Sequence, residues 1–453
     1  MQVPEVSNQE VESRKPRPGR KGEMGIAVLL VVACLAIIAP LTASFNYQAR
    51  VDWQSAVNVR DEVAARNIQR GAMSLSMLLF EIQGRVFNTG QFQQFMGTMD
   101  ITQVAPYLMA VFGTEDGADG LAGMGSLVGI DASGLSDVFR DLAIETGSFE
   151  YRVSAESGKI NVNCLHMQAD AGAKDNPAGR TVETLEALMS PALYDPLFEE
   201  EKSDGQFYTR HDIIKAIADY IDDDRQQFDL ILLRSGSGAE NYRYGQLFDP
   251  YQPRNARLDS IDELYLVEGI DDDWMEAFGH ELTVYGGCKV NLNFASAEQI
   301  ALVIRHAATA DDRWKTEGEN FVLRTMPLAN WVIEQREFSL FRDLEDFKER
   351  IAKPDQAFNP MLMMQLDATE QRSLPRIPEG IDVWMQGKAD PKDKSNHVRG
   401  LDDVAVVAPE RVYRIEVITT VGAVKKRLDA VYDIQYPRSQ SQGQGAWLYL
   451  REE

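Results

Sequence analysis

The longest uncharged stretch of the chain lies near its N-terminus. No charged side chain occurs between Ile26 and Ala49, and most positions there are apolar. At a rise of about 1.5 Å per residue, a helix of this length crosses a bilayer core of roughly 30 Å. The pattern predicts one transmembrane helix. A signal peptide cut near Ala43 is the alternative, and it is disfavoured because the apolar run exceeds the usual signal-peptide core.

Charge on either side of this span predicts its orientation. Residues 14–21 carry a basic cluster without an acid, whereas positive and negative side chains balance from Arg50 to Glu62. Basic residues remain in the cytoplasm when a membrane helix inserts. We therefore expect a single-pass inner-membrane protein with a cytoplasmic N-terminus and the bulk of the chain in the periplasm.

Helical periodicity continues after the span, from Val51 to Leu79. Apolar residues recur there at mostly helical spacings, namely at Val59, Val63, Ile68, Ala72 and Leu75. This stripe predicts that the N-terminal helix continues with one apolar face, either as a generic amphipathic helix or as a helix that packs on a sheet; the stripe alone does not choose between the two. Residues 84–140 are rich in Gly and Met and predict a variable connection.

Alternating polar and apolar positions predict strands in two places. Phe149–Val153 and Lys159–Asn163 flank a Ser/Glu/Gly turn and predict a β-hairpin. Val412–Val421 and Lys425–Ile434 predict two further strands around a turn at Gly422. The chain between these pairs is mainly helical in pattern, so the expected fold class is α+β.

The pattern of alternating apolar residues and asparagine occurs twice, as INVN at Ile160–Asn163 and as VNLN at Val290–Asn293. The second copy precedes Ser296, which we expect to cap the helix that follows it. In both places a strand-like segment leads into helical sequence.

Composition and motifs narrow the function. The net charge of −24 over 453 residues repels phosphate backbones and anionic lipids, and leaves soluble proteins and hard cations as better partners. The five histidines form no HExxH motif, the three cysteines form no CxxC motif, and nucleotide-binding and GxSxG patterns are absent. The sequence therefore indicates no enzyme.

The start of the apolar helix resembles the class III signal of type IV pilins and type II secretion pseudopilins. Residues 21–25 are a short leader that ends in Gly and directly precedes Ile26. By this resemblance, a prepilin peptidase cuts between Gly25 and Ile26, with Gly22–Glu23 as the alternative. Most members carry Glu at the fifth mature position, where this chain has Leu30.

The missing Glu, the ESGKINVN segment and the second asparagine pair together resemble minor pseudopilin K, over most of residues 26–436. The resemblance implies a type IV pilin-like long N-terminal helix and a small antiparallel sheet. It also implies a large inserted α-helical domain of two modules, similar to SAM and helix-hairpin-helix folds. The implied segments are a leader at 1–25, the transmembrane and pilin helix at 26–82, a variable connection at 83–140, the first part of the sheet at 141–166, inserted modules at 167–287 and 288–400, closing strands at 401–436 and a C-terminal tail at 437–453.

The same resemblance implies function and partners. Pseudopilin K forms the pseudopilus tip with minor pseudopilins I and J and starts fibre assembly for export of folded proteins across the outer membrane. The major pseudopilin, the inner-membrane secretion platform and prepilin peptidase are further implied partners, together with cargo or the secretin. A minor pilin of a type IV pilus is the nearest alternative.

An acidic cluster follows the helix at 211–221 and matches a run that the family associates with bound calcium. Carboxylates at a helix C-terminus repel one another and oppose the helix dipole, so a cation would stabilise them. The expected ligands are Asp222, Asp224 and Glu240, with Asp223 and Asn241 as weaker candidates. An exposed acidic turn without a metal is the alternative, and the spacing excludes an EF-hand.

Two further features leave alternatives open. Cys164 and Cys288 lie where the predicted insertion leaves and rejoins the sheet, so they either pair in the oxidising periplasm or remain two small core residues. Gly269 lies in a hairpin that resembles a phosphate-binding helix-hairpin-helix, which makes a membrane-anchored DNA receptor a second alternative. Glu268 and the acids at 271–273 would repel DNA, so we expect no nucleic-acid partner.

Overall fold

The computed structural model describes fifteen stretches of the chain, and all structural statements below refer to them. They are residues 21–90, 92–93, 98–105, 147–166, 176–202, 205–240, 244–246, 249–308, 318–337, 339–354, 374–377, 382–389, 397–398, 400–435 and 445–453. These residues form two compact units. The first contains the described chain up to Ala64 with Gly422–Val424, and the second contains the remainder.

The predicted long N-terminal helix is confirmed as α1, Lys21–Ile82, which continues into a π-helix at Gln83–Phe87. Its N-terminal part is long and apolar enough to span a membrane, with a mean hydropathy of 2.8 in the most apolar window and none of that window buried. This agrees with a single-pass anchor. In the same unit, Gly422 has a φ of +57° and lies against Asp61, where a Cβ atom would collide with the carboxylate.

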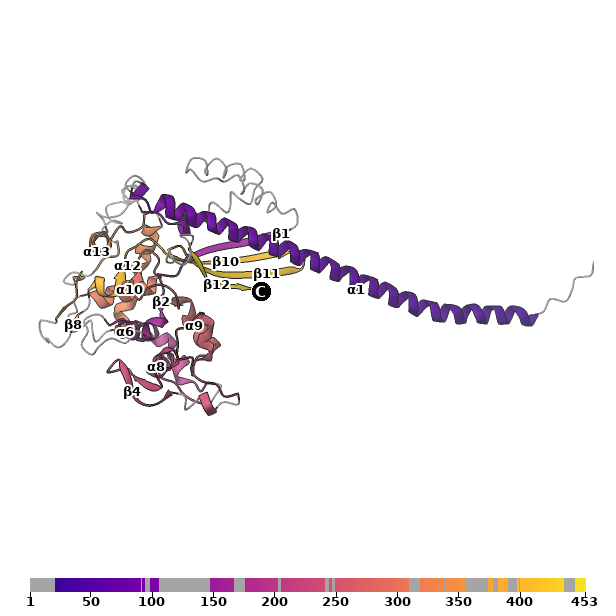
Figure 1. Ribbon diagram of the computed structural model, residues 1–453, viewed down its shortest axis with the longest axis horizontal. Coiled ribbons are helices and arrows are strands. Elements are labelled where there is room, and N and C mark those ends of the chain that lie inside the picture. The colour runs from indigo at the N-terminus through magenta and orange to yellow at the C-terminus, as the bar shows by residue number, and fades with distance from the viewer. Residues whose placement is uncertain are drawn as a thin grey trace, which may run out of the picture. The chain divides into compact units, whose positions relative to one another are not determined.

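The antiparallel sheet is also confirmed. It has the order β1-β10-β11-β12, with bounds Gly147–Ala155, Val412–Val421, Val424–Asp433 and Ala446–Glu452. The C-terminal part of α1 packs on it (Figure 1), and Phe80 stacks on Tyr413 and Tyr432 at ring distances of 4.9 and 5.1 Å. Of the predicted stripe, Ile68, Ala72 and Leu75 are buried. Val59 and Val63 are exposed.

Three sequence-based assignments need correction. The expected hairpin at 149–163 is wrong, because β1 pairs with β10 while β2, Ile160–Asn161, pairs with β5, Leu282–Thr283. The tail assigned to 437–453 contains strand β12, which pairs with β11. The second inserted segment extends past residue 400, because β9, Ala405–Val406, pairs with β6, Val290–Asn291.

The strand pairs β2–β5 and β6–β9 close two helical modules, which we call the first module (residues 160–283) and the second module (residues 290–406). Helices of the first are α6 at Pro177–Met189, α7 at Pro196–Glu199, α8 at Arg210–Ile221 and α9 at Asp272–Phe278. Helices of the second are α10 at Ala297–Ala307, α12 at Gly318–Arg336, α13 at Leu344–Ala352 and α17 at Leu401–Val404.

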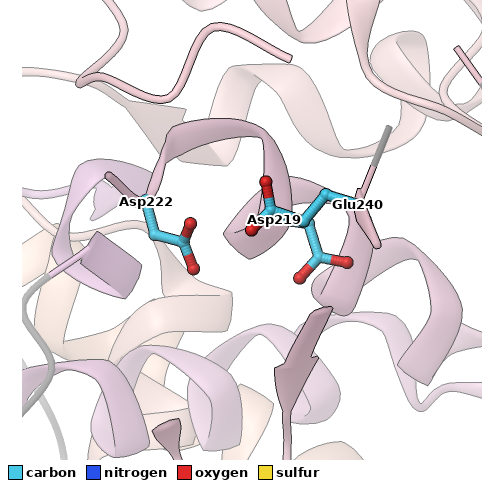
Figure 2. Close-up of side chains that lie close together, drawn as sticks. All are labelled: Asp219, Asp222 and Glu240. Atoms are coloured by element: carbon cyan, nitrogen blue, oxygen red, sulfur yellow. The ribbon is translucent and has the colours of Figure 1, made fainter. Parts of the chain in front are cut away.

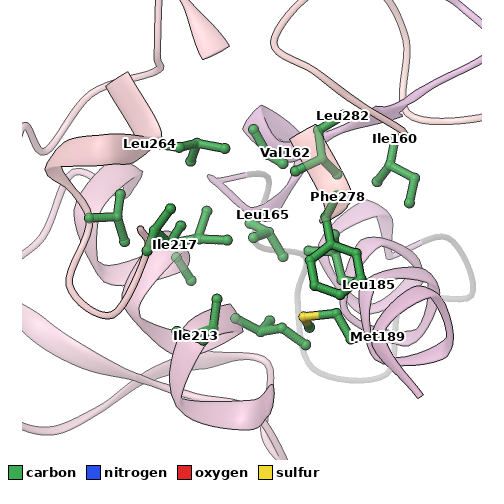
Figure 3. Packing of buried hydrophobic residues seen from close by; sticks show 14 of the residues in the cluster. Ile160, Val162, Leu165, Leu185, Met189, Ile213, Ile217, Leu264, Phe278 and Leu282 are labelled. Carbon is green, nitrogen blue, oxygen red and sulfur yellow. The ribbon is translucent and has the colours of Figure 1, made fainter. Parts of the chain in front are cut away.

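Shorter elements complete the modules. The first also contains strands β3 and β4, at Gln226–Asp229 and Arg234–Ala239, and 3-10 helices at Val162–His166, Ala192–Tyr194, Tyr244–Gln246, Ile261–Leu266 and Gly279–Glu281. The second contains the strand pair β7–β8, Lys388–Ala389 and His397–Val398. Each module has its own apolar core, and Figure 3 shows that of the first.

The repeated asparagines perform the same task in both modules. Asn163 accepts from the Leu258 amide at 2.8 Å and donates to the carbonyls of Leu258 and Val284 at 3.0 and 2.9 Å. Asn293 accepts from the Phe341 amide at 2.8 Å and donates to the Phe341 carbonyl at 3.1 Å. Buried backbone groups need such partners. Each asparagine therefore fixes the segment that enters the next capped helix.

The preceding asparagines complete the repeat. Asn161 donates to the carbonyls of Tyr285 and Gly286, both at 3.1 Å, and Asn291 donates to the carbonyl of Ala408 at 2.9 Å. Each ties the first strand of its module to the segment that leaves the module. This explains why Ile160–Asn163 does not turn back onto β1: its side-chain amides belong to the first module.

A candidate cation site in the first module

Helix α8 positions two acids on one face, one turn apart. The N-cap Thr209 forms a capping box with Asp212, and Ile213, Ile217 and Ile221 are buried in the module core. This packing fixes the rotation of α8. Asp219 and Asp222, three residues apart, consequently project from the same side of its last turn.

Glu240 joins them directly after strand β4. Carboxylate oxygens of Asp219, Asp222 and Glu240 all lie within 4.8 Å of one another. The three residues are 7%, 1% and 7% exposed, respectively. Figure 2 shows the two acids of α8 and Glu240 directed toward a common region. We call these three residues the acid cluster.

The acid cluster has few protein partners. Asp219 Oδ1 accepts from the Phe228 amide, which ties strand β3 to α8. Both carboxylate oxygens of Asp222, and Oε1 of Glu240, accept no hydrogen bond from the described residues. Burial raises the pKa of Asp219, and the opposite effect of the charge of Lys215, which lowers it, is smaller. Buried carboxylates are normally paired or bind a metal, so this cluster requires an additional positive charge or protons.

Electrostatics support that conclusion. Burial, reinforced by the charges of Asp224 and Asp219, raises the pKa of Asp222 to about 7. Burial and the neighbouring Asp222 raise the pKa of Glu240 to about 9. The pKa of Asp219 rises to about 7, mainly through burial. A divalent cation would reverse these shifts by stabilising the ionised carboxylates.

The donor set fits a hard cation. All three residues offer oxygen, the ligand type that calcium and magnesium prefer, whereas zinc and copper sites usually include nitrogen or sulfur. Flexible coordination distances of 2.3–2.6 Å suit calcium better than a rigid octahedron suits magnesium, because the ligands come from a helix and a strand end. Water and backbone carbonyls would supply the remaining ligands.

Only some of the predicted ligands lie in the acid cluster. Asp222 and Glu240 belong to the acid cluster, whereas Asp224 instead accepts from the Gln226 amide at 2.6 Å and from the Ser235 hydroxyl. Asp223 is exposed, and Asn241 lies outside the described residues. Sequence reasoning missed Asp219, although its spacing of three residues from Asp222 on an amphipathic helix was an available signal.

Other predicted residues occupy separate places. Cys164 and Cys288 form a disulfide that joins the two ends of the first module. Gly25 and Ile26, the predicted processing site, lie within α1. Gly269 has a φ of +79° and contacts Tyr208 and Ile213, so it serves a tight helix-to-helix turn.

Comparison with protein families identifies the first module. Residues 158–287 match the family model described as type II secretion system (T2SS), protein K. This match covers 130 of the 453 residues and shows that the first module is similar to protein K. The matched region contains the whole acid cluster and both strands that close the first module.

Two further comparisons accompany this match. No curated protein matches the chain by sequence. Among solved structures, the chain is similar to one in the crystal structure of the GspK-GspI-GspJ complex from the enterotoxigenic Escherichia coli type 2 secretion system. The TM-score is 0.39 at 15% identity, and the alignment covers 68% of this chain and 81% of that chain.

Proposed function

We propose that this chain is a minor pseudopilin of the protein K family, which caps the pseudopilus and starts its assembly with minor pseudopilins I and J. It would be anchored in the inner membrane by α1, with its N-terminus in the cytoplasm and the modules in the periplasm. The observation that carries the proposal is the family match at 158–287 in a chain whose exposed apolar helix continues into the sheet core.

The apolar fifth position supports a tip role. Leu30 lies at the position where most pilins and pseudopilins carry Glu, and it is 61% exposed on α1. A carboxylate inside a bilayer is costly unless a cationic group meets it, and in a fibre that group would be the N-terminal amine of a neighbouring subunit. A subunit with no neighbour above it has no such amine, so an apolar residue suits the end of the fibre.

The proposed cofactor is calcium. It would be held by Asp219, Asp222 and Glu240, and it would fix strand β4 against the end of α8. The orphaned carboxylate oxygens described above support this assignment. The proposed kinship of the modules with SAM and helix-hairpin-helix folds rests on their short capped helices and on the tight turn at Gly269.

The alternatives receive less support. A type IV minor pilin would share α1 and the sheet, but the protein K match lies in the inserted module and favours secretion. A DNA receptor is opposed by the acids around the Gly269 turn. Asp271 caps α9 and pairs with Lys202 Nζ at 2.7 Å, so neither of these residues is free for a phosphate.

N-terminal sequencing of the mature protein from its host tests the proposal. A start at Ile26 supports pilin-type processing, whereas a start near Ser44 contradicts it. Expression of Leu30→Glu in a strain lacking the native copy then tests the tip role. We expect fewer pseudopili and a shift of this subunit into the fibre, and unchanged assembly would contradict a tip position. Leu29→Ala, at a neighbouring apolar position, serves as the control.

A further inference from the structure

A pocket of about 570 Å³ lies where the sheet and both modules meet. Strand β1 forms one wall, the end of the first module forms a second, and the second module forms a third. The pocket shares no residue with the acid cluster. The side chains that matter below are Gln103, Lys159, His280, Glu281 and Arg336.

Arg336, the last residue of α12, lines this pocket, and its guanidinium has fewer hydrogen-bond acceptors than N–H donors. Its Nη1 donates to the Leu292 carbonyl at 2.9 Å, and its Nε and Nη2 have no acceptor among the described residues. Burial lowers the pKa of Arg336 to about 10. Glu337 follows Arg336 directly and also lines the pocket, and the charge of this carboxylate acts in the opposite direction and raises the pKa of Arg336. A guanidinium this desolvated is normally paired with an anion.

The backbone around Arg336 is fixed. The Gln103 side-chain amide donates to the carbonyls of Arg336 and Glu337, at 2.9 and 3.1 Å. This contact joins the end of α12 to the segment that follows α1 in the chain. The guanidinium is therefore held in place before any ligand arrives, which reduces the entropy cost of binding.

The other basic groups of the pocket already face carboxylates. Lys159 Nζ pairs with Glu156 at 3.2 Å, and His280 Nε2 lies 3.6 Å from Glu281 Oε1. The N–H donors that the pocket leaves to a ligand are therefore Nε and Nη2 of Arg336.

We propose that this pocket binds a carboxylate of a partner polypeptide, with Arg336 as its anchor. The planar fork of a guanidinium matches a carboxylate in a bidentate geometry. Apolar wall residues Val153, Ala155 and Leu340 suit a short peptide segment beside that carboxylate. A polyanion such as nucleic acid or a phosphorylated lipid is disfavoured, because the surrounding chain is strongly acidic.

Calorimetric titration of the full chain in detergent micelles tests the site. The probes are three acetylated tripeptides: Ala-Leu-Glu amide, with a side-chain carboxylate; Ala-Leu-Gln acid, with a terminal one; and Ala-Leu-Gln amide, with none. Inorganic phosphate is the fourth probe. We expect at least one carboxylate peptide to bind tenfold or more tightly than the neutral peptide. The comparison of the first two identifies the source of the carboxylate.

Variants assign the effect to Arg336. Arg336→Gln should remove the tenfold preference, whereas Arg342→Gln, at an exposed arginine of the same module, should preserve it. If Arg336→Gln fails to fold, Arg336→Lys retains the charge without the fork and should weaken binding severalfold. Equal binding of acidic and neutral peptides, absence of binding, an unaffected Arg336→Gln, or tighter binding of phosphate would overturn the proposal.

Discussion

The two modules begin alike and differ after their second long helix. In the first, residues 222–257 separate α8 from Leu258, the residue that Asn163 binds. In the second, residues 337–340 separate α12 from Phe341, the residue that Asn293 binds. The extra chain of the first module carries strands β3 and β4 and Glu240. The shared asparagines thus maintain the scaffold, while the added segment contributes Glu240 to the acid cluster.

The two helix ends also differ in charge. Asp222 follows the last residue of α8, where its carboxylate opposes the negative end of the helix dipole. Arg336 ends α12, where its guanidinium complements that dipole. With the proposed calcium, the first module would take an external cation at the position where the second supplies its own. The following predictions test this contrast, from the largest expected effect to the smallest.

Removal of the second asparagine from either module should be the most damaging change. Asn163→Ala orphans one amide and two carbonyls, and Asn293→Ala orphans one of each. At 1–3 kcal/mol for each buried orphan, we expect losses of about 4 and about 3 kcal/mol. Hydrogen exchange measured by mass spectrometry should localise each loss to its own module. Asn58→Ala, at an exposed asparagine, is the control. Equal protection from hydrogen exchange in all three variants would contradict the shared role of Asn163 and Asn293.

The carboxylates that attach the modules to the sheet should respond differently to pH. Although burial opposes ionisation, Lys159 and Arg414 hold the pKa of Glu156 below its usual value. The carboxylate of Glu410, which is 1% exposed, has only neutral donors among the described residues. They are the amide and hydroxyl of Ser157 and the backbone amides of Arg411 and Val412. Burial raises its pKa to about 7.

The raised pKa of Glu410 in the folded state determines whether stability rises or falls with pH. The stabilisation from Glu410 is complete below pH 4.5 and is lost as the pH rises through about 7, because the folded state then releases a proton that the unfolded state has already lost. The loss is about 3 kcal/mol for a shift of this size. Glu410→Gln should flatten the slope of unfolding free energy between pH 5 and 7. An unchanged slope would show that another group, such as buried Asp100, is responsible.

Removal of calcium should destabilise the first module alone. At free calcium a hundredfold above its Kd, binding contributes about 2.7 kcal/mol. Addition of a chelator should therefore increase hydrogen exchange in α8 and in strands β3 and β4, and leave α10 and α13 unchanged. Magnesium at the same concentration is the control for ion selectivity. Equal changes in both modules would indicate a general effect of the chelator.

The smallest expected effect is a difference in calcium affinity between variants of Asp219 and Asp224. Asp219→Asn should weaken calcium binding about tenfold or more, which corresponds to about 1.4 kcal/mol, because it removes a charged ligand. Asp224→Asn should change the Kd less than about threefold, since this residue already accepts from Gln226 and Ser235. Calorimetry on the full chain measures both. A larger effect of Asp224→Asn would restore the ligand set predicted from sequence.

Local patterns predicted much of this fold. The uncharged run from Ile26 was predictable from its length and composition. The strands on either side of Gly422 were predictable because burial of one face sets their alternating pattern. Strand β12 was missed, because the polar run at 438–446, which leads into it, is typical of a flexible tail. The hairpin expected at 149–163 was wrong because Asn161 and Asn163 bind carbonyls more than ninety residues away.

The sequence predicted that the candidate site binds a cation, but it predicted the ligand residues only in part. Three consecutive acids at a helix end indicated a cation, but the sequence could not show which of them faces the interior. That choice depends on the rotation of α8, which is fixed by packing of Ile213 and Ile217 in the module core. The pocket at Arg336 gave no sequence signal, because its walls come from distant segments.

The disulfide between Cys164 and Cys288 changes how the chain would carry tension. It links residues 124 positions apart and so encloses most of the first module in a covalent loop. A pull along the chain from β1 to β6 would pass through the sulfur bridge and bypass the residues of that loop. The first module can then gain or lose a cation, or open locally, without lengthening the tether that joins its neighbours.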